Sequence, residues 1–178
     1  MIKRVLVPLD GSELAERALV VAGDLAESLS ATIILARVVP PPVAGRFYAP
    51  SLIERLDEAH TQEAEAYLTS TAERLREDRL TVETRLLRGQ VAPILVAEAM
   101  RDRCDLIAIT SHGMSGLGSQ VFGSVAQKLL CSAPCPVLVV RSVPEELERE
   151  EEFEAGVADE ALLAQISTSP NPGATHAG

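Results

Sequence analysis

The chain has 178 residues, 47% of them hydrophobic, and a formal net charge of −10. This length suits one domain with an additional tail, and the hydrophobic content excludes a disordered protein. Because no apolar run approaches the roughly 20 residues that cross a bilayer, and the N-terminal apolar run is too short for a signal sequence, we expect a cytoplasmic protein without a membrane span.

The negative charge is concentrated at the C-terminal end. Residues 1–141 carry 15 basic and 17 acidic side chains, whereas residues 142–178 carry one basic and nine acidic ones. A nearly neutral body lacks the clustered Lys and Arg that nucleic acids require, which argues against nucleic-acid binding. We expect residues 142–178 to form an acidic extension that is largely disordered or loosely helical. Its apolar side chains could alternatively dock onto the body or a partner.

Short apolar segments alternate with helical patterns along residues 1–141. Strands are predicted at residues 5–9, 32–39, 82–87, 105–109 and 136–141, the last of which begins at Pro136 and ends at Arg141. Apolar residues at helical spacing predict helices at residues 13–29, 51–78, 93–100 and 123–130. This alternation predicts a doubly wound α/β fold, with five parallel strands and helices on both faces of the sheet.

A glycine-rich stretch, T-S-H-G-M-S-G-L-G-S-Q-V-F-G-S, occupies residues 110–124 between the fourth strand and the last helix. Its glycines let the backbone approach a ligand closely, and the unpaired amides at the start of the next helix suit an anion. We therefore predict a phosphate-binding loop. The loop contains no Lys or Arg, so we do not expect efficient phosphoryl transfer.

The strand order decides where a ligand would bind. In a sheet of order 3-2-1-4-5, strands one and four meet where the order reverses, and ligands bind at such points. Asp10 follows the first strand and the glycine-rich loop follows the fourth. A nucleotide suits this pair, with Asp10 near a ribose hydroxyl or a metal ion. Two structural alternatives stay open: Asp10 could be only a turn or cap residue, and Ser124 could form a capping box with Gln127.

These segments resemble the universal stress protein family. The resemblance rests on P-L-D-G-S at residues 8–12, T-S-H-G at 110–113, G-S at 123–124 and A-P-C-P-V-L-V-V at 133–140. ATP-binding members carry the pattern G-x2-G-x9-G-[ST]. Gly113, the nine-residue spacer and Gly123-Ser124 match this pattern, whereas Thr110 replaces its first glycine. The resemblance covers residues 1–141 and implies an adenine nucleotide alpha hydrolase-like fold in that domain.

The resemblance also implies a function and a set of binding residues. Asp10 would face the ribose or adenine, Val38 would contact adenine through its backbone, and the amides around Gly113 and Gly123 would hold the phosphates with Ser124. The residues expected to bind nucleotide are Pro8, Leu9, Asp10, Val38, Ile109, Thr110, Gly113, Gly123, Ser124 and Val125. The expected ligand is ATP, with Mg²⁺ or Mn²⁺ reaching Asp10 through the nucleotide. A homodimer paired through the fifth strand, residues 136–141, is also implied.

No residue is assigned a catalytic role. His112 is adjacent to Ser111, and adjacent residues seldom form a nucleophile and base pair. Cys131 and Cys135 resemble half of a metal site that nothing completes, so we interpret the three cysteines, including Cys104, as buried free thiols. The sequence thus predicts an ATP-binding stress-response regulator that is at most a very weak ATPase. The alternatives are a ligand-free dimeric interaction protein and a slow ATPase.

Overall fold

The computed structural model describes residues 1–41, 50–111 and 122–141. All of them belong to the first of the two units into which the chain divides, residues 1–142. The predictions made for His112, for Gly113 and for the extension at residues 142–178 therefore lie outside the described residues.

Five parallel strands form one sheet in the order β3-β2-β1-β4-β5, which confirms the predicted topology. The strands are β1 (Arg4–Leu9), β2 (Thr32–Val39), β3 (Thr81–Arg88), β4 (Leu106–Thr110) and β5 (Val137–Val140). Of the interior strands, β1 has four buried residues among its six, and all five residues of β4 are buried. A continuous apolar run is typical of a parallel strand that is covered on both faces.

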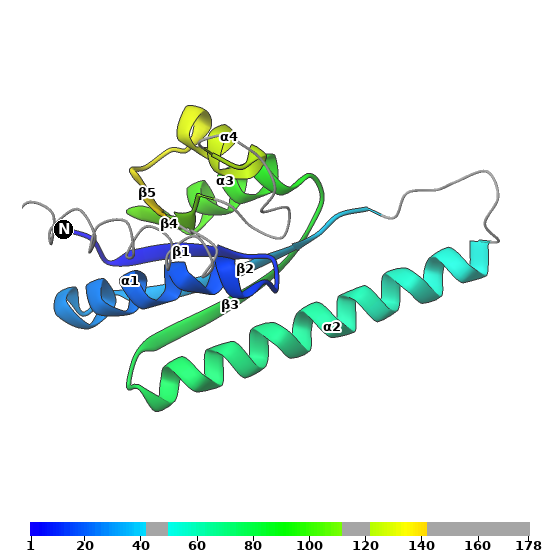
Figure 1. The fold of residues 1–178 in the computed structure, drawn as a ribbon, viewed down its shortest axis with the longest axis horizontal. Helices are drawn as coiled ribbons and strands as arrows, with labels where there is room; N and C mark the ends of the chain where they lie inside the picture. The colour runs from blue at the N-terminus through cyan, green and yellow to red at the C-terminus, as the bar shows by residue number, and fades with distance from the viewer. Residues whose placement is uncertain (42–49, 112–121, 142–178) are drawn as a thin grey trace, which may run out of the picture. The chain divides into compact units, whose positions relative to one another are not determined.

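Four helices connect the strands in the described residues: α1 (Glu13–Leu29), α2 (Pro50–Glu77), α3 (Val91–Arg101) and α4 (Ser124–Ser132). Figure 1 shows α1 and α2 on one face of the sheet and α3 and α4 on the other, as a doubly wound fold requires. Helix α3 begins two residues before Pro93. A proline is tolerated in the first helical turn because its missing N–H has no intrahelical partner there.

Each face of the sheet has its own hydrophobic core. Under α1 and α2, the buried side chains of β1 and β2 include Val7, Ile33 and Leu35. Under α3 and α4, they include Leu6 and Ile34 from the same two strands. The alternation follows from the two-residue period of a strand, which sends successive side chains to opposite faces.

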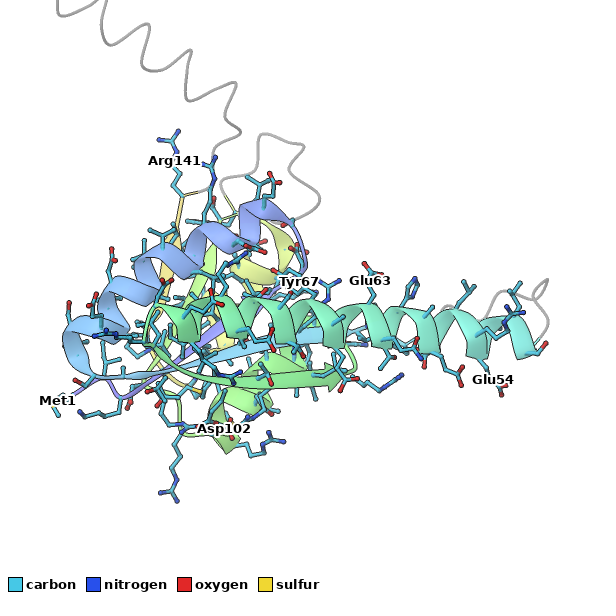
Figure 2. The ribbon with its side chains drawn as sticks, turned by 90° about the horizontal axis from the view of Figure 1, so that it is seen from below. Met1, Glu54, Glu63, Tyr67, Asp102 and Arg141 are labelled. Atoms are coloured by element: carbon cyan, nitrogen blue, oxygen red, sulfur yellow. The ribbon has the colours of Figure 1, made fainter. Side chains whose placement is uncertain are left out.

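Helix α2 is longer than the sheet that it covers. Its second half buries Leu68 and Leu75, whereas Leu52 and Leu56 in its first half are 42% and 48% exposed. The first half, which carries Glu54, extends beyond the strands (Figures 1 and 2). Although α2 has 28 residues, neither it nor any other helix of the described segments is long and apolar enough to span a membrane.

Hydrogen bonds of Asp105 connect the start of β1 to the start of β4. The Oδ2 atom of Asp105 accepts hydrogen bonds from the backbone N–H groups of Lys3, at 2.7 Å, and Arg4, at 3.0 Å. The backbone N–H of Asp105 in turn donates to the carbonyl oxygen of Arg4, at 2.9 Å. The two N–H donors hold the pKa of the Asp105 carboxyl below its usual value of 3.8, because they stabilise the charged form.

We expect the Asp105 carboxylate to make folding stability depend on acid pH. Because its pKa is lower in the folded state than in the unfolded state, its stabilisation is present at neutral pH and is lost as the pH falls through the folded-state pKa. The free energy of unfolding should therefore fall below about pH 4, and less steeply in Asp105→Asn. Urea unfolding at a series of pH values measures this. Parallel curves for both proteins would contradict the assignment.

Candidate functional site

A cavity of about 360 Å³ opens at the carboxyl ends of β1, β2 and β4, where the strand order reverses. Residues of α1, α3 and α4 and of the adjoining loops supply its remaining walls. It is lined by Pro8, Leu9, Asp10, Ala15, Ala36, Arg37, Val38, Pro40, Val91, Leu95, Ile109, Thr110, Ser111, Gly123, Ser124, Val125 and Ala126. Its position is the one at which open α/β sheets bind ligands, and its volume lies within the range of small-molecule pockets.

The structure brings nine of the ten predicted binding residues to this one cavity. They are Pro8, Leu9, Asp10, Val38, Ile109, Thr110, Gly123, Ser124 and Val125. The tenth, Gly113, is outside the described residues. Residues up to 117 positions apart in the sequence thus surround one volume, because β1, β2 and β4 are neighbours in the sheet. Nucleotide binding by these residues stays a prediction.

The cavity wall has an apolar part and a polar part. Apolar side chains, among them Leu9, Val38 and Leu95, make up much of the lining, whereas Asp10 and Ser124 add polar groups. A flat, mostly apolar group with polar edges suits the apolar part, and a charged group suits the polar part. An adenine nucleotide has this division.

The start of α4 leaves its backbone amides without a side-chain cap. Gly123 is the N-cap residue, and no side chain there accepts a hydrogen bond from the first turn. Ser124 is already the first residue of the helix, so the alternative of a capping box from Ser124 to Gln127 is wrong. The N–H of Gly123 donates to the carbonyl oxygen of Ser111, at 2.6 Å. This bond fastens the start of α4 to the end of β4.

Asp10 supports the turn that starts α1. Its Oδ1 atom accepts hydrogen bonds from the Ser12 backbone N–H, at 3.0 Å, and from the Ser12 hydroxyl, at 2.6 Å. The Ser12 Oγ atom accepts from the Ala15 N–H, at 3.1 Å, so Ser12 is the helix cap and Asp10 is not. The turn alternative for Asp10 is therefore present in the structure. A ligand contact, from an atom that also borders the cavity, stays a prediction.

The described residues contain no group of three or more His, Cys, Asp or Glu side chains that could hold a metal ion. A divalent ion beside Asp10 would therefore take most of its ligands from nucleotide phosphates and water. Cys104 is buried, but Cys131 is exposed. The prediction of buried thiols is thus wrong for Cys131, which lies on the outer side of α4 and not toward the sheet.

Thr110, the residue in place of the first motif glycine, is the last residue of β4. It is 4% exposed and borders the cavity. Its Cα lies opposite that of Val140 in β5, so the strand holds its backbone in place. A residue with a side chain is accommodated here without breaking the sheet.

Sequence reasoning missed Arg37 and Gly11. Arg37 borders the cavity, and among its described lining residues only Asp10 and Arg37 carry a charge. Gly11 has a φ of +84°, and a Cβ atom there would lie 2.4 Å from Nη1 of Arg37. The available signal was a lone arginine at the carboxyl end of a buried strand, I-I-L-A-R-V-V, where a charge is unfavourable without a partner.

The sequence matches the Universal stress protein family over residues 1–141. A relative from Thermus aquaticus, named "Universal stress protein in QAH/OAS sulfhydrylase 3'region", is 35% identical over 144 residues. The match covers 79% of this chain and 100% of the relative. The remaining 21% of this chain lies outside the match. Family membership is carried by the domain that holds the cavity.

Solved structures agree with the fold. A universal stress protein in complex with cAMP superposes with a TM-score of 0.61 at 23% identity, covering 80% of this chain and 98% of that one. A family protein from Arabidopsis thaliana with AMP bound superposes with a TM-score of 0.57 at 18% identity, covering 81% and 94%. With a family match over residues 1–141 and this sheet topology, the chain belongs to the universal stress protein family.

Proposed function

We propose that this chain is a stress-response regulator that binds ATP in the cavity at the sheet switch point and does not turn it over efficiently. The observation that carries the proposal is the uncapped start of α4, which borders an otherwise largely apolar cavity. Free amides at a helix start attract phosphate oxygens, and apolar walls suit a base. The cAMP and AMP bound to two proteins of the same fold support an adenine nucleotide as the ligand.

Weak catalysis follows from the groups around the cavity. The Oδ1 atom of Asp10 already accepts two hydrogen bonds from Ser12, which makes the carboxylate a poor general base. The described residues offer no cluster of metal-binding side chains. Phosphoryl transfer needs a metal ion or several fixed cations to stabilise the developing charge. We therefore expect nucleotide to be held and released unchanged, in the cytoplasm.

We further propose a homodimer through β5. This strand lies at one edge of the sheet, and all four of its residues are partly exposed. An edge strand presents unpaired backbone N–H and C=O groups to a second strand. A second chain that pairs here would cover Val137 to Val140.

Calorimetry tests the ATP proposal. Nucleotide-free protein is titrated with ATP, with and without Mg²⁺, up to high micromolar concentrations. We expect saturable heat of binding and phosphate release at the background of the buffer. No binding heat under either condition would favour the second candidate, a ligand-free dimeric interaction protein. The specific observation in its favour is Thr110, whose side chain occupies a position at the cavity where a glycine would leave more room.

A further inference from the structure

Arg37 is a cation in an unusual place. It lies in β2 opposite Leu9 of β1 and borders the cavity beside Asp10. Arg37 and Val38 are half-buried, and Ala36 and Val39 in the same strand are 1% and 5% exposed. A charged side chain among buried neighbours is unfavourable unless it has partners that offset the loss of water. The partners of Arg37 therefore indicate what it does.

One partner is an aromatic ring on α2. The Cζ atom of Arg37 lies 5.2 Å from the centre of the Tyr67 ring, within the range of a cation–π contact. The Tyr67 hydroxyl donates to Oε1 of Glu16 on α1, at 2.9 Å, and Nη2 of Arg74 donates to Oε2 of the same carboxylate, at 2.5 Å. Figure 2 shows Tyr67 on the part of α2 that lies along the sheet.

These contacts fix the ring that holds Arg37. Burial, first, and the hydrogen bond to Glu16, second, raise the pKa of Tyr67 far above its usual value. The hydroxyl therefore stays protonated and keeps donating to Glu16. A cation–π contact is made through the face of the ring, so it positions the cation without requiring a hydrogen-bond acceptor.

One of those donors has no acceptor. Nη1 of Arg37 is buried and makes no hydrogen bond within the described residues. It also lies so close to Gly11 that a Cβ atom there would be 2.4 Å away, and the φ of Gly11, +84°, favours glycine. A buried N–H of a cation without an acceptor is unfavourable. An anion in the cavity that Arg37 borders would offset this cost through the charge of the guanidinium.

We propose that the guanidinium of Arg37 binds a phosphate group of the nucleotide, and so makes the cavity prefer nucleotides to nucleosides. This inference rests on the proposed function. The planar fork of a guanidinium matches two phosphate oxygens, and the stack on Tyr67 holds the fork in one place before the ligand binds. Arg37 then supplies the positive charge that the glycine-rich loop lacks.

The affinities of ATP, AMP and adenosine for wild type and Arg37→Met test this inference. Methionine keeps a long apolar side chain on the Tyr67 ring but removes the charge. We expect ATP and AMP to bind about tenfold more weakly or worse to the variant, with adenosine unchanged. Arg37→Lys should lie between the two, because it keeps the charge and loses the fork. Arg55→Met is the matched control, since it removes a charge from an exposed position outside the cavity.

The outcomes separate this inference from the proposed function. If wild type binds no adenine nucleotide, the proposed function fails and this inference with it. If wild type binds ATP and Arg37→Met binds it equally well, only the inference on Arg37 is overturned. If Arg37→Met loses the same affinity for ATP as for adenosine and also has a lower melting temperature, the inference is overturned as well, because Arg37 would then be a packing residue. A weaker dependence of ATP affinity on salt in Arg37→Met supports it.

Discussion

Truncating Leu6 to alanine is expected to lower the free energy of unfolding by about 2–5 kcal/mol. Leu6 is 0% exposed and lies in β1, which has β2 on one side and β4 on the other. Its side chain belongs to the core under α3 and α4. Because strands on both sides hold β1 in place, the sheet cannot collapse into the space left by the missing atoms. The void that remains lowers the free energy of unfolding further, in addition to the loss of buried apolar surface.

Urea unfolding followed by circular dichroism measures this loss, and Leu56→Ala is the matched control. Leu56 is 48% exposed on the part of α2 that extends beyond the strands (Figure 2), so its truncation should change the free energy of unfolding by no more than about 0.5 kcal/mol. A loss below about 1 kcal/mol in Leu6→Ala would mean that the core under α3 and α4 repacks, and that β1 is less constrained than its position indicates.

The strand order was predictable because it depends on few choices. Apolar runs such as V-L-V-P-L at residues 5–9 and L-I-A-I at 106–109 predict strands covered on both faces. Helices between them force parallel pairing, and right-handed crossovers then leave few arrangements. The start of α3 was less predictable. Pro93 indicates the first turn of a helix, but a proline can occupy any of the first few helical positions, so it does not fix the first residue.

The outline of the cavity was also predictable, because the glycine-rich loop and Asp10 both follow strands that meet at the switch point. The local hydrogen bonds were not. Ser12 and Asp10 both carry cap-forming oxygens, and only the backbone angles of the turn show that Ser12 caps α1 and that Asp10 bonds to Ser12. Likewise, Gly123 and not Ser124 is the N-cap of α4. If α4 began one residue later, Ser124 would be the N-cap residue and not the first residue of the helix.

Arg37 could not be found by pattern because its environment is tertiary. Its aromatic partner, Tyr67, is 30 positions away on α2. The sequence does not determine the rotation of this helix about its axis precisely enough to show that Tyr67 faces Arg37. The carboxylate that holds the ring, Glu16, comes from a third element. An isolated arginine in a strand is usually interpreted as a solvent-exposed edge residue. Only the joint packing of β2, α1 and α2 makes it a cavity residue.

Replacing Gly123 with valine is expected to weaken ATP binding by on the order of a hundredfold, with a loss of stability of about 1 kcal/mol because valine is a poor N-cap residue. The backbone of Gly123, at φ −64° and ψ 158°, is extended and accepts any side chain. Its N–H, which donates to Ser111, is also kept. Because Gly123 borders the cavity, we expect the isopropyl group to hinder the approach of a phosphate to the first amides of α4. Calorimetry with ATP measures the affinity, and thermal melting confirms that the fold is retained.

Ser124→Ala should have a smaller effect, about three- to tenfold, because one neutral hydroxyl is lost and the amides remain. Ser132→Ala is its matched control: this hydroxyl, at the other end of α4, donates to the Lys128 carbonyl at 2.7 Å and does not border the cavity, so ATP affinity should be unchanged. If Gly123→Val and Ser124→Ala both bind ATP like wild type, the phosphates do not lie at the start of α4. The phosphates would then be held by Arg37 and by residues that precede Gly123, without the amides of α4.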